Sequence, residues 1–302
     1  MIKYYKRTSK DRKLRVLKKF ENDCWINVVD PSDDEIEYLV EKFNLDKENL
    51  ISGIDKNEIP RVEFDNKTYV ISSVVTDIKN HELGTFLLIV GKKFILTFME
   101  KEPNFIEKIL ENKLKFVTTE KKFSMLNLMY EINEDFEKAI NSIEKNVNMK
   151  KAQATHLKEK DVTLLLEYEE KLNRFASAYS HNIAVYNKIN KKIKFYGKDK
   201  DRFESIVIEI NEGFQLCKNS LKNISNIRNY YLILLSNRLN RIITIFTMLT
   251  VMISIPAAIS GIYGMNILLP FQNDPSVIFY IIAIIMIFWA VFFVYLKKSK
   301  IL

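Results

Sequence analysis

The chain has 302 residues, of which 47% are hydrophobic and 28% are charged, and its formal net charge at pH 7 is +8. This composition excludes a disordered chain and a protein that lies entirely within a membrane. The two cysteines are far apart and the three histidines lack metal-ligand spacing, so a disulfide framework and a Cys- or His-based zinc site are both disfavoured.

Residues 1–117 have the pattern of a mixed α/β domain. The run Trp25–Val29 predicts a strand. Ser32 and Glu35 have the spacing of a capping box, which predicts that an amphipathic helix begins here and continues over 33–44. Three further strand-like runs follow, the last two joined by a short glycine-containing turn: Tyr69–Val75, Thr85–Val90 and Phe94–Phe98. We therefore expect a sheet with helices packed against it.

Residues 118–240 predict a helical stalk, because this segment contains no proline and only two glycines. We expect three long helices, the first over 122–160 and the second over 161–196, with Gly197 separating them from the third. Apolar residues recur at three- and four-residue spacing over 203–234, which is typical of a coiled-coil-like seam. No helix-breaking residue follows until the middle of the next apolar run, so the third helix is expected to continue into that run.

The last fifth of the chain contains two long uncharged runs. Ile242–Ile262 has 21 residues and Val277–Leu296 has 20. A helix rises about 1.5 Å per residue, so each run is long enough to cross the roughly 30 Å hydrocarbon layer of a membrane. We therefore predict transmembrane helices over 241–263 and 277–296, with a connecting loop over 264–276.

Basic residues mark the outer ends of this pair of helices. Arg238 and Arg241 precede the first run, and a basic tail over 297–302 contains Lys297, Lys298 and Lys300. Because basic residues mark the cytoplasmic side, we predict a multi-pass protein of the cell membrane with both termini and the soluble part in the cytoplasm. The connecting loop, which carries the single acid Asp274, then faces outward.

Small and polar residues lie along one face of the first run. Steps of three and four residues align them on a helix: Asn240, Ile243, Thr247, Thr250, Ser254, Ala257 and Gly261. Such a stripe either lets helices pack closely in the bilayer or lines a polar pore, and the residues alone favour the two about equally. Two helices per chain cannot enclose a pore, so the pore alternative requires an oligomer. The second run is bulky and aromatic, which suits contact with lipid.

The sequence contains no recognisable catalytic or nucleotide-binding motif. Neither a GxSxG element nor a glycine-rich phosphate loop occurs, so an enzyme and an ATP-driven pump are both disfavoured. Acidic residues are interspersed with the basic ones and argue against nucleic acid as a partner. One acidic cluster could attract cations but is more typical of a solvated helix face: Glu131, Glu134, Asp135 and Glu137.

The residues that end the first run are the most informative in the chain. The tetrapeptide there, which follows Ser260-Gly261-Ile262, resembles the YGMN signature of the CorA family of magnesium transport channels: Tyr263, Gly264, Met265 and Asn266. It lies at the outer end of the first of two C-terminal spans, as in that family. Three other segments are similar to segments common in the family, so the resemblance covers the whole chain: Trp25–Asn27, Glu58–Glu63 and Asn237–Asn240.

The resemblance implies an α+β cytoplasmic domain, a long helical stalk and a funnel-shaped homopentamer in a lipid bilayer. Five first-span helices would line the pore with the stripe described above, and five second-span helices would surround them. Near the inner end, Ile243 and Phe246 would gate the pore by dewetting. Hydroxyl groups of the stripe, and backbone carbonyls freed near Pro256 and Gly261, would contact water.

At the outer mouth, the resemblance implies a ring that selects the ion and is formed by Tyr263, Gly264, Met265 and Asn266. Mg²⁺ gives up its water reluctantly, so the Asn266 side-chain carbonyls would hydrogen-bond the water shell of a hydrated ion. Gly264 would permit the tight turn that places Asn266 at the axis, and a helix C-cap is the alternative role for both residues. Mg²⁺ would enter down the membrane potential, past the lysines around the inner mouth: Lys297, Lys298 and Lys300.

One departure from the family pattern concerns regulation. Many relatives carry an acidic pair just before the segment that matches 58–63 and another acid on the stalk helix, and Mg²⁺ bound there closes the channel. The matching positions in this chain are Ile51, Ser52 and Ser205. The candidate replacements, which would give weaker or relocated Mg²⁺ sensing, are Asp55, Asp201 and Glu204.

Two alternative functions follow from the same residues. The same architecture could carry Co²⁺, Ni²⁺ or Zn²⁺, although neither span contains the His or Cys ligands that softer ions prefer. Alternatively, the chain could be a non-transporting membrane anchor that presents a coiled-coil sensor in the cytoplasm. An anchor would tolerate replacement of Gly264 and Asn266, whereas a channel would not.

Overall fold

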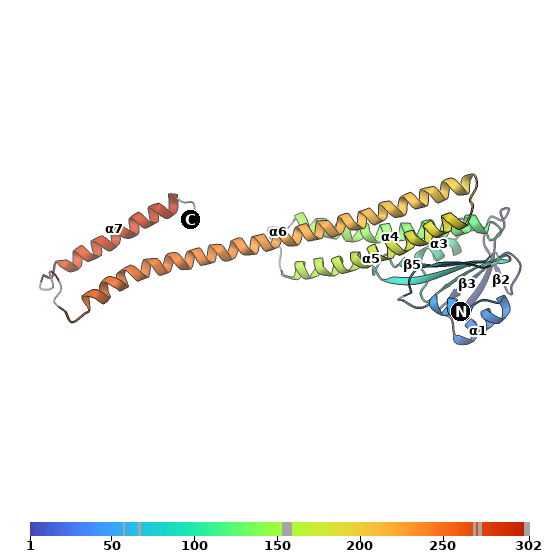
Figure 1. Ribbon diagram of the computed structural model, residues 1–302, viewed down its shortest axis with the longest axis horizontal. Coiled ribbons are helices and arrows are strands. Elements are labelled where there is room, and N and C mark those ends of the chain that lie inside the picture. Colours follow the sequence, from blue (N-terminus) through green and yellow to red (C-terminus); the bar gives the residue numbers. More distant parts are fainter. Residues whose placement is uncertain (57, 66–67, 153–158, 268–269, 271–273, 299–302) are drawn as a thin grey trace. The chain divides into compact units, whose positions relative to one another are not determined.

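The computed structural model describes residues 1–56, 58–65, 68–152, 159–267, 270 and 274–298. Its contacts divide the chain into two compact units, Met1–Arg228 and Asn229–Leu302. The first unit combines a β-sheet with helices, and the second contains helices (Figure 1). Helix α6 (Lys198–Tyr263) has residues in both units.

The first unit is built on one mixed sheet. In order across the sheet its strands are β2 (Arg15–Leu17), β1 (Ile2–Lys6), β3 (Cys24–Val29), β7 (Phe94–Met99), β6 (Leu83–Val90), β5 (Thr68–Thr76) and β4 (Val62–Asp65). Strands β3 and β7 pair in parallel, and the other neighbouring strands pair antiparallel. The four predicted strands are confirmed as β3, β5, β6 and β7, whereas β1, β2 and β4 were not predicted.

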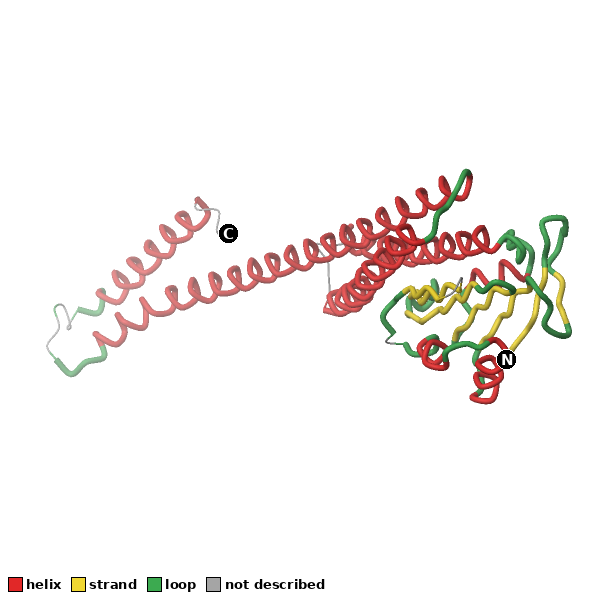
Figure 2. The backbone as a smooth tube through the Cα atoms, turned by 45° about the vertical axis from the view of Figure 1, so that its right-hand side comes forward, coloured by secondary structure: helices red, strands yellow, loops and turns green. Residues whose placement is uncertain are grey.

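Different helices cover the two faces of the sheet (Figures 1 and 2). Helices α1 (Asp33–Phe43) and α2 (Lys47–Ser52) lie on one face, where a buried apolar cluster joins them to the strands: Cys24, Ile26, Val28, Ile36, Leu39, Leu50, Leu87, Ile89, Leu96 and Phe98. Helices α3 (Asn104–Leu110), α4 (Lys121–Ala152) and α5 (Glu159–Lys192) lie on the other. Removal of both apolar faces from water is the main force that holds the layers together.

The predicted capping box at the start of α1 is confirmed. Ser32 Oγ accepts a hydrogen bond from Glu35 N–H at 3.3 Å, and Ser32 N–H donates to Glu35 Oε2 at 3.1 Å. Glu35 also accepts from Ile2 N–H at 3.0 Å, so one side chain both caps α1 and ties it to β1. The helix ends at Asn44, whose φ of 50° is a left-handed conformation that asparagine tolerates.

The first long helix was predicted over 122–160, and its predicted end is wrong. Glu159 and Lys160 already belong to α5, and residues 153–158 between the two helices lie outside the described part of the chain. The polar sequence there carries no proline or glycine, so nothing in the local pattern indicates a break.

The second long helix ends at Lys192 rather than at the predicted Tyr196. The next residues turn inward, and Phe195, which is 8% exposed, stacks on Phe203 of α6 with ring centroids 4.9 Å apart. Gly197, with a φ of 51°, then reverses the chain at a conformation that favours glycine. Burial of Phe195 thus stabilises the turn, and α5 ends earlier than predicted.

Within the first unit, α6 has the predicted seam, with buried apolar side chains at Phe203, Ile206, Ile210, Cys217, Ile224 and Ile227. Gly213 and Ser220 are buried in the same line. A Cβ atom at position 213 would overlap the hydroxyl of Tyr179 on α5. The glycine therefore allows the close approach of α5 and α6, a role that an apolar pattern does not reveal.

We expect Gly213→Ala to destabilise the first unit by about 1–3 kcal/mol, because the added methyl group overpacks a buried contact. Denaturant unfolding of the full-length protein in detergent measures the change. Gly84→Ala is the matched control, since the nearest atom to its added Cβ is Val75 Cγ2 at an ordinary 3.9 Å. Equal unfolding midpoints for Gly213→Ala and wild type would show that Tyr179 can move aside without loss.

Two members of the acidic cluster on α4 are buried, so the predicted solvated helix face is only partly correct. Glu131 is 7% exposed and pairs with Lys108 of α3, and Asp135 is 1% exposed. Among the described residues, neither carboxylate oxygen of Asp135 has a hydrogen-bond partner. Burial, which outweighs the nearby Lys108 and Lys138, raises the pKa of Asp135 to about 6.

Candidate ion pathway

Two helices are long and apolar enough to cross a membrane: α6 near its C-terminal end, and α7 (Val277–Lys298). In the described residues, no side chain of the most apolar stretch of either helix is buried within the chain. A soluble protein rarely exposes so large an apolar surface to water. Neither stretch is a buried core helix of this single chain, and such exposure is typical of helices that lipid or further copies of the chain cover.

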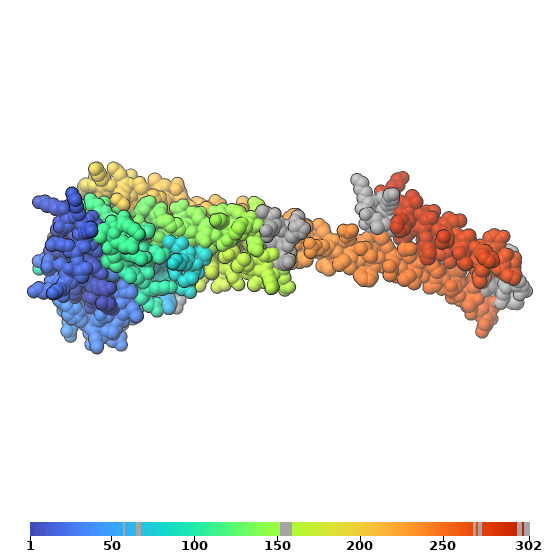
Figure 3. Space-filling view, turned by 180° about the vertical axis from the view of Figure 1, so that it is seen from behind, coloured from blue at the N-terminus to red at the C-terminus, as the bar shows by residue number. Residues whose placement is uncertain are grey.

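Helix α7 lies along the C-terminal part of α6 within the second unit (Figure 3). The half-buried residues of α6 in this part are Thr244, Met248, Val251, Met252, Ile255, Pro256 and Ile259. They share one side of the helix, and the Trp289 indole on α7 bonds the Met252 carbonyl there. This side of α6 therefore faces α7.

The predicted pore-lining positions lie on the other side of α6. All eight are exposed in the chain: Asn240, Ile243, Phe246, Thr247, Thr250, Ser254, Ala257 and Gly261. With 3.6 residues per turn, the centre of this stripe is roughly 140° around the helix from the side that faces α7. The stripe is therefore available to neighbouring copies or to a water-filled space.

The hydroxyl groups of the stripe donate their hydrogens to the helix itself. Thr247 Oγ1 donates to the Ile243 carbonyl at 2.8 Å, and Thr250 Oγ1 donates to the Phe246 carbonyl at 2.9 Å. Ser254 Oγ is 3.1 Å from the Val251 carbonyl. Each hydroxyl oxygen keeps its lone pairs free as acceptors. Water molecules around a cation point their hydrogens outward, so such acceptors suit a hydrated cation.

Gly264 follows the last residue of α6 and lies at the C-cap position, the alternative role given for it above. Its N–H donates to the Ser260 carbonyl at 2.9 Å and so extends the helical bonding by one residue. Its φ lies outside the left-handed region, and a Cβ atom there would lie 3.1 Å from the Ser260 oxygen. Glycine is thus favoured by this close approach and not by a left-handed turn. Met265 N–H bonds the Ile262 carbonyl at 3.2 Å, and Asn266 is exposed beyond it.

Asp274 precedes α7 and organises its first residues. Its Oδ1 accepts hydrogen bonds from Ser276 Oγ at 2.6 Å and from Ser276 N–H at 2.9 Å. These two bonds hold the pKa of the Asp274 carboxyl below its usual range. The carboxylate is therefore charged at neutral pH and also has a local structural role. At the other end of α7, Lys298 is exposed, while Lys300 and the Lys297 side chain lie outside the described part.

The candidate regulatory positions do not form one site within the chain. Ser52 is 8% exposed and accepts a hydrogen bond from the Arg61 guanidinium at 3.2 Å. Ser205 is exposed on α6 and bonds the Asp201 carbonyl oxygen at 3.1 Å. Glu204 lies 3.7 Å from Lys200 on the next turn. In the described ranges, no three His, Cys, Asp or Glu side chains are close enough to hold a metal ion.

Arg61 is a residue that the sequence reasoning missed. It contacts Glu58, forms an ion pair with Glu63 at 2.9 Å and donates to Asn49 Oδ1 at 2.8 Å. Its cationic group therefore lies beside Ser52. The only sequence signal was its place between two glutamates in the segment 58–63.

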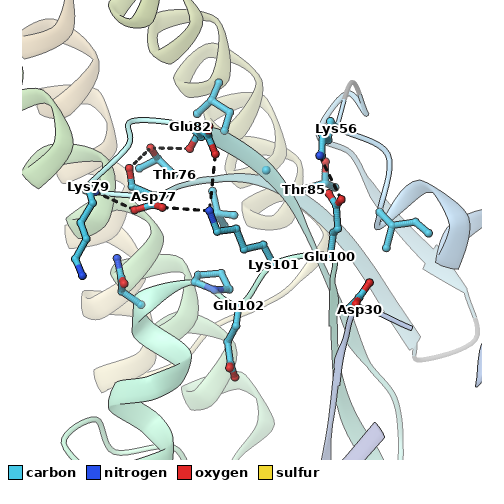
Figure 4. A pocket seen from close by; sticks show the side chains of 16 residues that line it. Asp30, Lys56, Thr76, Asp77, Lys79, Glu82, Thr85, Glu100, Lys101 and Glu102 are labelled. Carbon is cyan, nitrogen blue, oxygen red and sulfur yellow. Dashed lines mark hydrogen bonds and ion pairs between the residues drawn. The ribbon is translucent and has the colours of Figure 1, made fainter. Parts of the chain in front are cut away.

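The first unit also contains a hollow of about 580 Å³ at the end of β7 (Figure 4). Five acids and three lysines are among its lining residues, and several of them pair with each other. Lys101 pairs with Asp77 at 3.4 Å and Glu82 at 3.8 Å, and Lys56 pairs with Glu100 at 3.2 Å. Such ion pairs are typical of a solvated surface network, and the hollow has two more acids than lysines among its lining residues.

Comparison with known proteins identifies relatives along nearly the whole chain. Residues 21–298 match the family model described as CorA-like Mg²⁺ transporter protein. The chain is 24% identical over 298 residues to a cobalt/magnesium transport protein CorA of Methanocaldococcus jannaschii, covering 91% of this chain and 90% of that protein. It is 26% identical over 275 residues to a magnesium transport protein CorA of Campylobacter jejuni, covering 82% and 81%.

The fold is also similar to a solved structure. The complete structure of the CorA magnesium transporter from Methanocaldococcus jannaschii superposes with a TM-score of 0.86 at 20% sequence identity. The match covers 99% of this chain and 98% of that one. At this identity the likeness concerns the fold: the α/β part, the long helix and the two C-terminal helices.

Proposed function

The chain belongs to the CorA-like Mg²⁺ transporter family, and we propose that it is a channel through which hydrated Mg²⁺ enters the cytoplasm. The observation that carries the proposal is the exposed polar stripe of α6, which leads to the Gly264-Met265-Asn266 sequence at the helix end. The inside-negative membrane potential drives the ion. Each 100 mV contributes about 4.6 kcal/mol for a divalent cation, twice the value for one charge.

The channel is a homopentamer in the cell membrane. Two apolar helices per chain cannot surround a pore, so α6 helices from five copies line it and α7 helices form an outer ring facing lipid. This arrangement uses the stripe of α6 that α7 leaves exposed. Basic residues at both ends of the helix pair support a cytoplasmic location for both termini. Lys297, Lys298 and Lys300 then surround the inner mouth.

The outer mouth selects the ion by its water shell. Mg²⁺ dehydrates reluctantly, and a ring of Asn266 side-chain carbonyls offers acceptors to its bound water. Tyr263, Gly264 and Met265 hold this ring at the end of α6. Along the pore, the hydroxyl oxygens of Thr247, Thr250 and Ser254 continue the row of acceptors. Near the inner end, Ile243 and Phe246 interrupt it and close the pore by dewetting.

Mg²⁺ sensing in the cytoplasmic part is weaker than in relatives with an acidic pair, or is relocated. Ser52 offers a hydroxyl group where a carboxylate would bind a divalent cation more tightly, and the Arg61 guanidinium beside it is already paired with Glu58 and Glu63. Asp55, Asp201 and Glu204 are close in sequence to the two positions, and Glu58 and Glu63 also lie near Ser52 through Arg61. We propose that any regulatory ion binds between copies, where acids of two chains come together.

A second candidate is transport of Co²⁺ or Ni²⁺ by the same pore. A filter that binds the water shell discriminates weakly among divalent ions of similar size, and one relative is named a cobalt/magnesium transport protein. The uncharged spans, which lack His and Cys, favour Mg²⁺ over softer ions such as Zn²⁺.

The test is ion uptake into liposomes that contain the purified wild-type protein under an imposed inside-negative potential. We expect Mg²⁺ uptake that rises with the potential, from a particle whose mass corresponds to five chains. Preferred uptake of Co²⁺ or Ni²⁺ at equal concentration would favour the second candidate. A well-folded oligomer that moves none of the three ions would indicate a membrane anchor.

A further inference from the structure

Pro256 lies inside α6, in the middle of the predicted first span. Proline has no backbone N–H, so the carbonyl four residues earlier, that of Met252, loses its partner within the helix. In the hydrocarbon layer no water is available to replace that bond, and an unsatisfied carbonyl costs several kcal/mol. The expectation from sequence was that carbonyls freed here contact water in the pore.

The structure places a different partner on this carbonyl. The indole Nε1–H of Trp289 on α7 donates to the Met252 oxygen at 3.3 Å. Trp289 lies near the middle of α7, away from the headgroup region where tryptophans of membrane proteins gather. A buried indole N–H needs an acceptor of its own. One hydrogen bond therefore satisfies both a donor and an acceptor that would otherwise be unpaired at mid-membrane.

The packing around this bond is open. Leu249, Met252, Ile253, Pro256 and Trp289 line a hollow of about 390 Å³ between the two helices. Leu249 and Ile253 are more than half exposed here, so the hydrogen bond is one of the few contacts that relate α6 to α7 along this hollow. The bond lies on the side of α6 opposite the polar stripe. Contacts that hold this side of α6 against α7 therefore also keep the polar stripe facing away from α7.

We propose that Trp289 is a positioning residue for ion conduction: its indole replaces the hydrogen bond that Pro256 removes and so holds the stripe and the Gly264–Asn266 end toward the pore. The inference rests on the proposed function, because it assigns a role in that pore. Asn266 follows Pro256 by less than three turns, so a small rotation of the helix at the proline displaces the filter.

The test is a double-mutant cycle between Trp289→Phe and Pro256→Ala. Phenylalanine keeps an aromatic ring but removes the donor. Alanine at position 256 restores an N–H for the Met252 carbonyl and makes the indole unnecessary. We expect Trp289→Phe to lower the initial rate of Mg²⁺ uptake about fivefold in the wild-type background and to have little effect in Pro256→Ala. Tyr280→Phe, which removes a donor from an exposed position of α7, is the matched control and should transport normally.

The thermal unfolding midpoint of the same variants in detergent is the second measurement. Trp289→Phe should lower it in the wild-type background and leave it unchanged in Pro256→Ala. An equal loss in both backgrounds, or none in either, would overturn the inference. If wild type moves no ion, the proposed function fails, whereas the thermal cycle still decides whether the indole replaces the missing bond. The thermal cycle is also decisive if Pro256→Ala alone stops transport.

Discussion

Replacement of Asn266 by alanine is expected to reduce potential-driven Mg²⁺ uptake at least tenfold, to the level of empty liposomes. The change removes the side-chain carbonyl and amide from every copy around the outer mouth, so five acceptors are lost together. A hydrated ion then meets methyl groups where its water shell had hydrogen-bond partners, and entry at the mouth becomes unfavourable. The fold should survive, because Asn266 is exposed and follows the end of α6.

The matched control is Asn190→Ala, which removes the same side chain from an exposed position on α5 in the first unit. Uptake should remain near the wild-type rate. Gel filtration of both variants in detergent checks that the oligomer is intact. Wild-type uptake by Asn266→Ala would show that the filter lies elsewhere, and it would remove the reason for assigning selectivity to the end of α6.

The contribution of Asp135 to the free energy of unfolding of the first unit is expected to increase as the pH falls from 7.5 to 4.5. Burial raises the pKa of this carboxyl from 3.8 to about 6 in the folded chain. Between these values the folded state binds a proton and the unfolded state does not, so the free energy of unfolding rises as pH falls. About two pKa units correspond to about 3 kcal/mol per chain in full, of which about 2 kcal/mol is gained between pH 7.5 and 4.5.

Asp135→Asn tests this contribution, because the amide keeps the shape but cannot ionise. The amide has its own burial cost, which does not change with pH, so the informative quantity is the stability difference between variant and wild type at each pH. We expect that difference to shift by about 2 kcal/mol in favour of wild type between pH 7.5 and 4.5. Urea unfolding in detergent measures it, followed by the fluorescence of the buried Trp25 in a background that carries Trp289→Phe.

Glu137→Gln is the control for this experiment. Glu137 is on the same helix but exposed, so its removal should change stability by less than about 0.5 kcal/mol at any pH. The charged groups that act on Asp135 are Lys108 on α3 and Glu131, Glu134 and Lys138 on α4, and none of them is altered. A stability difference for Asp135→Asn that does not change with pH would mean that the carboxylate is solvated in the folded protein.

Part of the fold follows from local pattern alone. Strands β3, β5, β6 and β7 consist almost wholly of apolar, β-branched and hydroxyl residues, and such runs are strands in most buried sheets. Strand β1, with the sequence IKYYK, has two adjacent tyrosines between two lysines and no alternating apolar pattern. Its extended form depends on pairing with β2 and β3. A single segment does not reveal the strands that will bond to it.

The sequence by itself determined the two apolar helices, the uninterrupted helix that leads into the first of them, and the family. Each depends on composition or on a short contiguous motif: 21 uncharged residues, the absence of a helix breaker from Gly213 to Pro256, and the residues 263–266. Hydrophobic length and helical bonding are properties of neighbouring residues, so they can be predicted without knowing what lies opposite them.

Only the tertiary structure decided which polar groups are buried and what they contact. The sequence places Asp135 among solvated acids, Ser52 in a possible ion site and Trp289 among lipid-facing aromatics. In the fold, Asp135 lies in the interior, Arg61 lies beside Ser52, and Trp289 bonds the carbonyl that Pro256 leaves free. The energy of a buried polar group depends on the partner that packing brings to it. Arg61 is 9 residues from Ser52 in the sequence, and Trp289 is 37 residues from Met252.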